Sequence, residues 1–197
     1  MFDPLRTTLK RSAGLAILAV LVASAATAQD QGYIKAYSEK GSPADAGVFI
    51  NGQYVGPAHR FTISEKYPAP AGEVEVTFKD PRYDDYTVKV NVQARKTTKI
   101  KYSMKLLESA KPPFGRLRLG GGEAESFISV AAGDTGAVYI NNRFYGYVDE
   151  LNNAGGGLLL NPGTYDLHVS SQKFGEINQK VTIEANKVTV VPLPTGK

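Results

Sequence analysis

The segment Gly47–Gly56 reads GVFINGQYVG and decides the fold. Its centre is Asn51-Gly52, and both residue types tolerate the positive φ angles that a type I′ turn between two strands requires. The residues on either side, 48–50 and 53–55, are mostly β-branched or aromatic, as is typical of strands. The segment therefore predicts a β-hairpin.

The same hairpin pattern recurs 90 residues later, where residues 137–146 read AVYINNRFYG. Asn141-Asn142 at its centre still permits a tight turn. A further block, PAGEVEV at residues 70–76, recurs as NPGTYDL at 161–167 with a shift of 91. A repeat that keeps its register through several turns predicts two copies of one folding unit.

Apolar residues alternate with polar ones in both copies. Val74, Val76 and Phe78 do so in the first copy and Tyr165, Leu167 and Val169 in the second. A period of two indicates strands with one buried face. The segment at 104–113 (MKLLESAKPP) lacks this pattern, and we interpret it as a linker in which a short helical turn over 105–110 stays open. The strand pattern at 116–119 is expected to be an addition in front of the second copy.

The N-terminus has the order of a secretory signal. Basic residues at positions 6, 10 and 11 precede the apolar run 13–23 and an A-x-A site at 26–28. The apolar run is shorter than the roughly 20 residues of a membrane span, although an uncleaved anchor stays an alternative. Cleavage lowers the formal net charge from +4 to +2, which by itself does not favour a nucleic-acid or membrane surface. The chain has no Cys, so disulfides cannot stabilise it.

These patterns predict an all-β protein with a cleaved leader and no membrane span in the mature chain. The expected boundaries are a signal peptide at 1–28, a first β domain at 29–104, a linker at 105–114 and a second β domain at 115–197.

The motif residues resemble the PEGA domain family. In the second copy these are Gly136–Asn141, the turn Asn161–Tyr165 and Lys173-Phe174-Gly175; the first copy keeps Ala46–Gly52 and Gly56 but degrades the later turn. The resemblance covers most of residues 32–193 and is better in the second copy. It implies two tandem small β-sandwiches of immunoglobulin-like or transthyretin-like type, in an exported protein of the periplasm or cell surface. It also implies a non-catalytic accessory module.

The residue inventory agrees with a non-enzyme without a cofactor. His59 and His168 do not occupy equivalent positions, no G-x-S-x-G segment occurs, and the Gly-rich loops lack the residues of a phosphate loop. No basic stripe interleaved with aromatics is apparent along the chain. Asp80, Asp84 and Asp85 are weak candidates for a calcium site, because Arg82 lies among them and the EF-hand spacing is absent.

The candidate binding residues are aromatic and basic side chains around the two hairpins: Tyr54, Arg143, Phe144, Tyr145 and Tyr147. Aromatic side chains near turns can form a docking surface. The leading hypothesis is a binding or scaffolding protein of the bacterial envelope, whose partner is another envelope protein or a cell-wall glycan. Three alternatives stay open: a carbohydrate- or peptidoglycan-binding module, a metal-dependent module that uses the three Asp, and a structural subunit that assembles through strand edges.

Overall fold

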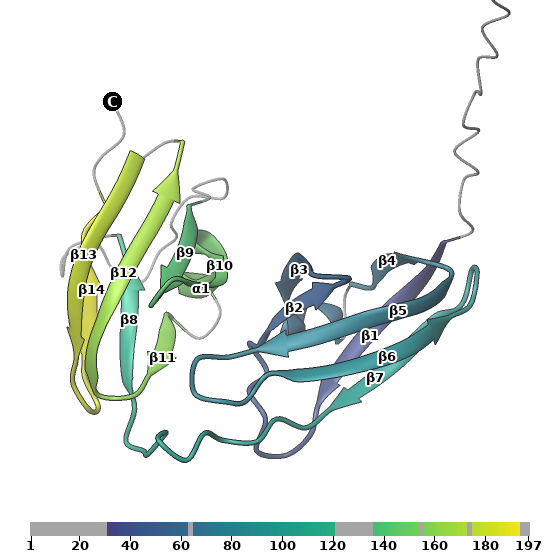
Figure 1. Ribbon diagram of the computed structural model, residues 1–197, viewed down its shortest axis with the longest axis horizontal. Coiled ribbons are helices and arrows are strands. Elements are labelled where there is room, and N and C mark those ends of the chain that lie inside the picture. The colour runs from purple at the N-terminus through teal and green to yellow at the C-terminus, as the bar shows by residue number, and fades with distance from the viewer. Residues whose placement is uncertain (1–30, 63–64, 121–135, 154–155, 173–174, 194–197) are drawn as a thin grey trace, which may run out of the picture.

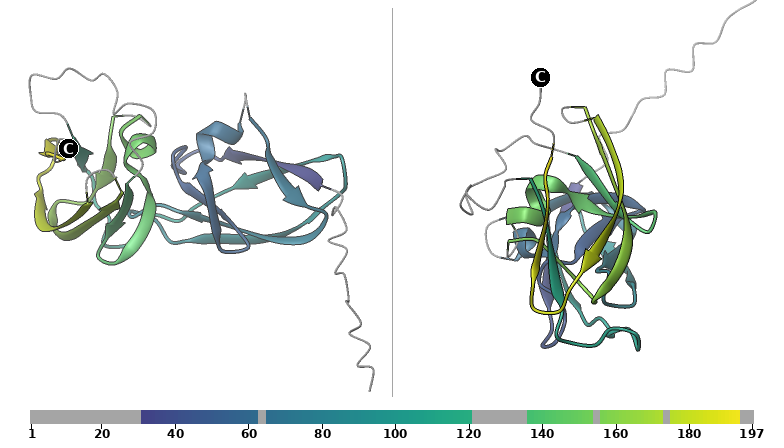
Figure 2. Two further views of the ribbon diagram at one scale, coloured as in Figure 1. Left: turned by 90° about the horizontal axis from the view of Figure 1, so that it is seen from above. Right: turned by 90° about the vertical axis from the view of Figure 1, so that its left-hand side faces the viewer.

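The structure, a computed structural model, describes residues 31–62, 65–120, 136–153, 156–172 and 175–193. The predicted signal peptide therefore lies outside the described residues. Figures 1 and 2 show two β-rich units side by side along the long axis of the molecule. We call them the first repeat (described from residue 31 to 104) and the second repeat (from 115 to 193).

The first repeat consists of two sheets. The order of strands is β4-β1-β7 in one sheet and β3-β2-β5-β6 in the other. The strands are β1 (Gln31–Ser38), β2 (Gly47–Ile50), β3 (Gln53–Pro57), β4 (Tyr67–Pro70), β5 (Gly72–Lys79), β6 (Tyr86–Val92) and β7 (Thr97–Tyr102). Neighbouring strands are antiparallel except for the parallel pair β1 and β7.

The second repeat has the same topology, with sheets β11-β8-β14 and β10-β9-β12-β13. Its strands are β8 (Gly115–Leu119), β9 (Ala137–Ile140), β10 (Arg143–Tyr147), β11 (Leu158–Leu160), β12 (Gly163–Ser171), β13 (Gly175–Ile183) and β14 (Val188–Val191). Each strand of the first repeat thus has a counterpart in the second. The predicted all-β architecture of tandem sandwiches is confirmed.

The two hairpin turns are built as the sequence predicts. Asn51 and Gly52 have φ angles of 49° and 79°, and Asn141 and Asn142 have 49° and 62°. The side-chain oxygen of Asn51 also accepts the backbone N–H of Glu75 on β5. That of Asn141 accepts the backbone N–H of Asp166 on β12 in the same way. The first Asn of each turn therefore ties the hairpin to its sheet as well as closing it.

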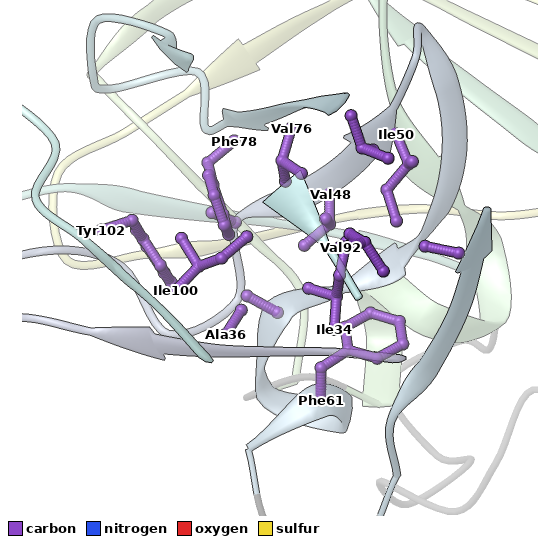
Figure 3. Packing of buried hydrophobic residues seen from close by; sticks show 14 of the residues in the cluster. Ile34, Ala36, Val48, Ile50, Phe61, Val76, Phe78, Val92, Ile100 and Tyr102 are labelled. Carbon is purple, nitrogen blue, oxygen red and sulfur yellow. The ribbon is translucent and has the colours of Figure 1, made fainter. Parts of the chain in front are cut away.

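Each repeat has its own hydrophobic core between its two sheets. In the first repeat, Ile34 of β1 and Val76 of β5 enter the core from opposite sheets (Figure 3). Phe78 stacks on Tyr102 with ring centroids 4.0 Å apart. In the second repeat, Leu117 and Leu167 occupy the corresponding positions. Since no residue belongs to both clusters, the two cores are separate.

The strand at 116–119 is not an addition, which corrects the sequence-based expectation. β8 is the counterpart of β1, because Gly115 and Gly32 have the same surroundings. A Cβ atom added at Gly32 would lie 2.3 Å from the carbonyl oxygen of Gln93, and one at Gly115 would lie 2.2 Å from that of Glu184. Only glycine lets this first strand approach the turn before the last strand so closely.

The short helices of the structure lie at other positions than the segment 105–110, where the sequence leaves a helical turn open. The short 3₁₀ helix η1 (Ala58–Phe61) follows β3, and its counterpart α1 (Val148–Asn153) follows β10. The segment 105–110 contains no helix. It instead lies along the β5–β6 connection, where the amide of Leu107 donates to the carbonyl of Arg82 and that of Asp84 to the carbonyl of Lys105.

Candidate functional site

The two equivalent hairpins face each other between the repeats, where the edge strands β3 and β10 of the two four-stranded sheets meet (Figure 1). Tyr54 of β3 and Phe144 of β10 occupy equivalent positions of the repeat. Their rings contact each other edge to face with centroids 5.1 Å apart. Two of the predicted binding residues therefore contact each other.

Five rings form what we call the aromatic cluster. Phe49 and Tyr54 come from the first repeat, and Tyr139, Phe144 and Tyr147 from the second. The three ring pairs that cross between repeats have centroids 5.1 to 6.2 Å apart. Such pairs each contribute about 0.5–1.5 kcal/mol beyond the area they bury. The cluster is thus a substantial attachment between the repeats.

A β-bulge decides which residues of the RFYGY segment join this cluster. The pairing of β10 with β9 is irregular between Phe144 and Gly146, with Tyr145 as the additional residue. Strict alternation would place Phe144 and Tyr147 on opposite faces, but the bulge returns Tyr147 to the face of Phe144. Tyr145 points the other way and is only 7% exposed, in the core of the second repeat.

Glu150 of α1 forms the polar part of the interface. Its carboxylate accepts the Tyr54 hydroxyl at 2.7 Å and an Arg60 guanidinium N–H at 3.3 Å, both from the first repeat. It also accepts the backbone N–H of Tyr147 at 3.4 Å, and only 16% of its side chain is exposed. Burial raises the pKa of Tyr54 above its ordinary value of 10.0, and the charge of Glu150 raises it further.

A second ion pair joins the repeats at the hairpin end. One guanidinium nitrogen of Arg143 lies 2.8 and 2.9 Å from the two carboxylate oxygens of Asp85. The side chain of Arg143 is 55% exposed, so solvent screens this pair. It therefore contributes more to the orientation of the repeats than to their affinity.

The three candidate metal ligands do not converge. Asp80 is 6% exposed and binds the Arg82 side chain through both carboxylate oxygens, whereas Asp85 binds Arg143. Asp84 is exposed. Within the described ranges, no three His, Cys, Asp or Glu side chains are grouped as a metal site would require.

A small cavity of about 100 Å³ lies between the repeats, beside Glu150. Tyr54 and Asp80 line it from the first repeat, and Arg116, Tyr145 and Leu158 from the second. Sites for small molecules usually measure about 300–1,000 Å³. The size of the cavity fits a few water molecules better than an organic ligand.

A cluster on β12 and β13 was not singled out by the sequence. The carboxylate of Glu176 accepts the Ser170 hydroxyl and contacts Nε2 of His168, both at 2.6 Å, and these hydrogen bonds lower the pKa of Glu176. The Ser170 hydroxyl is bound to the carboxylate and not to the imidazole. The order of contacts therefore differs from a nucleophile–base–acid relay, in which the base contacts the nucleophile.

The family model of the PEGA domain matches residues 40–107. The match covers 68 of the 197 residues, about a third of the chain. The matched PEGA domain lies in the first repeat, although the motif residues favoured the second. Its range includes the β2–β3 hairpin, η1 and Asp85, and thus the whole first-repeat side of the interface.

Two solved structures have low similarity to this chain. One is described as the Bacillus anthracis TIE protein, with 17% identity and a TM-score of 0.31, covering 83% of this chain and 33% of that one. The other is a leucine-rich repeat protein from Bacteroides thetaiotaomicron, with 13% identity and a TM-score of 0.25, covering 83% and 26%. The chain thus spans a third or less of their length. No curated protein matches it. In the described part of the chain, no helix has the length and apolarity needed to cross a membrane.

Proposed function

We propose that this protein is a non-enzymatic binding or scaffolding module of the bacterial envelope, in which the two repeats act as one rigid body. The contact of the equivalent hairpins, centred on Tyr54 and Phe144, carries this proposal. Two domains on a free linker would present their surfaces independently. Two domains joined by an aromatic cluster and two charged contacts present them in one fixed arrangement, which is what a scaffold needs.

The exported location belongs to the same proposal. It is supported by the charged, apolar and A-x-A segments at the N-terminus and by the PEGA domain, a family of exported, non-catalytic modules. The partner we propose is another envelope protein, which would span surfaces of both repeats.

The test is retention of a partner from solubilised envelope fractions on the immobilised mature chain. A Tyr54→Ala/Phe144→Ala variant should keep both cores but lose the fixed arrangement, and we expect it to retain at least about tenfold less partner. Thr182→Ala, an exposed change away from the interface, is the matched control. Retention of nothing above background at several salt concentrations would argue against the scaffold.

Glycan binding is the second candidate, and of the five predicted binding residues Tyr147 supports it best. Phe49, Tyr54 and Phe144 use their rings to contact one another, so a sugar could stack on them only if the repeats separated. Tyr147 is 36% exposed at the rim. A titration of cell-wall glycans monitored by Tyr fluorescence, with Tyr147→Ala as the variant, tests this candidate. Unchanged glycan affinity in that variant excludes the site.

Assembly through strand edges remains the third candidate. The edges of β3 and β10 already face each other within one chain, which leaves β6 and β13 as the outer edges of the two four-stranded sheets. Light scattering over a concentration series distinguishes this candidate from the other two, because only strand addition predicts a mass that grows with concentration.

A further inference from the structure

The outer face of the sheet β4-β1-β7 is basic and aromatic, and we call it the basic face. Strand alternation turns Tyr33, Lys35 and Tyr37 of β1 outward, because Ile34 and Ala36 between them are buried in the core. On β7, Lys99 and Lys101 are exposed on the same side, on either side of the buried Ile100. These side chains come from strands more than sixty residues apart in the sequence, and only their pairing brings them together.

The register of β1 with β7 places side chains of the basic face side by side in pairs. Lys35 is paired directly with Lys99, and Tyr37 with Lys101. Lys66 adds a further ammonium group, 3.9 Å above the ring of Tyr33. The strands β4, β1 and β7 contain no Asp or Glu. Four ammonium groups, from Lys35, Lys66, Lys99 and Lys101, thus gather on one face of a chain whose net charge is small.

This arrangement opposes stability, which points to a use outside the fold. Like charges directly across a pair of strands are destabilising. Within the described residues, Lys89, Lys180 and Lys187 form ion pairs on other strands and turns, and Lys35 donates to the carbonyl of Thr62 at 3.5 Å. At the position equivalent to Lys99 the second repeat has Val190, so the sandwich architecture does not require a lysine there.

We propose that the basic face docks on the surface of an anionic lipid bilayer. Lysine ammonium groups bind phosphate headgroups, while their methylene stems and the tyrosine rings lie at the level where headgroups meet acyl chains. A sheet face is broad and open, which suits a planar surface better than a single polymer strand. The cavity beside Glu150 lies elsewhere, between the repeats.

Lipid docking assigns a membrane-binding surface to the proposed envelope module. It rests on the proposed function only in assuming that the protein is located at the envelope. The two can fail separately. Loss of lipid binding would leave partner retention from detergent-solubilised envelopes intact, since that assay depends on the interface between the repeats and not on β1 and β7.

The test is co-sedimentation of the mature chain, residues 29–197, with vesicles of phosphatidylcholine containing 30% phosphatidylglycerol and with vesicles of phosphatidylcholine alone. We expect binding to the anionic vesicles only, weakened by added salt. Because each surface lysine favours binding to such vesicles by roughly fivefold, Lys99→Gln/Lys101→Gln should bind about 30-fold more weakly.

The matched control is Lys89→Gln/Lys180→Gln, which removes the same two charges from exposed positions on the four-stranded sheets. It should bind within about threefold of the wild type. A melting temperature that is not below that of the wild type in either variant shows that the fold is intact. Equal affinity of the two variants, or equal binding to uncharged vesicles, would overturn the proposal. Binding of single-stranded DNA or soluble polyphosphate without any vesicle binding would overturn it as well.

Discussion

The hydroxyl of Tyr54 in the first repeat donates a 2.7 Å hydrogen bond to the carboxylate of Glu150 in the second. The two residues are 96 positions apart, and this contact connects the PEGA domain at 40–107 to the helix that follows the second hairpin. Hydrogen bonds to a charged group contribute more than neutral ones when they are partly shielded from water. This bond therefore adds a directional contact to the apolar packing between the two repeats.

Removal of this hydroxyl should weaken the molecule. Tyr54→Phe keeps the ring in the aromatic cluster but deprives Glu150 of its donor, and we expect a loss of about 1–2 kcal/mol in the free energy of unfolding, measured by urea titration. Tyr165→Phe is the control, because the Tyr165 hydroxyl donates within the second repeat to the Asn161 carbonyl. Slow hydrogen exchange on β3 and β10 should be lost only in the Tyr54 variant. Equal exchange in the two variants would contradict the assignment.

Alkaline pH should destabilise the protein through the same residue. Burial and the charge of Glu150 raise the pKa of Tyr54 in the folded state, so above its ordinary value of 10.0 the unfolded chain ionises first. The contribution of Tyr54 is therefore complete below about pH 10 and is lost as the pH rises further. Burial also raises the pKa of Tyr102, Tyr145 and Tyr165, so the wild type is compared with Tyr54→Phe. The urea midpoint should fall less steeply in the variant, and parallel curves would refute this.

Glycine substitutions test the equivalence of β1 and β8. Gly32→Ala and Gly115→Ala would each place a Cβ atom within 2.5 Å of a backbone oxygen and a core side chain, and should cost about 1–3 kcal/mol each. Gly47→Ala is the control, because its added carbon would lie 3.2 Å from a Tyr54 ring atom and the second repeat already has Ala137 there. If Gly115→Ala proved as mild as Gly47→Ala in thermal unfolding, the counterpart assignment would be wrong.

The RFYGY segment should separate into core and interface residues. Tyr145→Ala empties part of the second core and is expected to cost about 3 kcal/mol, by analogy with truncations of other buried aromatic residues. Tyr147→Ala removes a ring that is 36% exposed and should cost about 1 kcal/mol. Urea unfolding of the two variants measures the difference. A larger loss for Tyr147 would mean that the bulge is placed incorrectly.

Local signals in the sequence were sufficient for much of the fold. The turns at Asn51-Gly52 and Asn141-Asn142 depend on residue types that accept positive φ, and the core residues on β5 and β12 follow a period of two. These features depend on near neighbours in the chain. The role of residues 116–119 was not evident, because the shift from Gly32 to Gly115 is 83 residues and not 90 or 91. The assignment of this strand as the counterpart of β1 depends on the close approach of Gly115 to Glu184, which is a contact between distant parts of the chain.

The sequence predicted most of the residues of the candidate site, but it did not predict that they form the contact between the two repeats. Tyr54, Phe144 and Tyr147 were singled out as aromatic residues near turns, and the structure brings them together, whereas Tyr145 points into the core. Their mutual contact depends on how the two repeats pack, for which the sequence has no local signal. The basic face was missed for the same reason, since the parallel pairing of β1 with β7 joins residues far apart in the chain.

The contact between the rings of Tyr54 and Phe144 is the central claim, and nuclear Overhauser effects between their ring protons test it most directly. In a mature chain with selectively labelled Tyr and Phe, the ring centroids at 5.1 Å should give clear cross-peaks between these two side chains. Tyr139 and Phe144, which contact each other within the second repeat at 5.5 Å, serve as the internal reference. Cross-peaks for both pairs are the predicted result. A Tyr139–Phe144 cross-peak without one between Tyr54 and Phe144 would contradict the account, because the repeats would then not be docked through their hairpins.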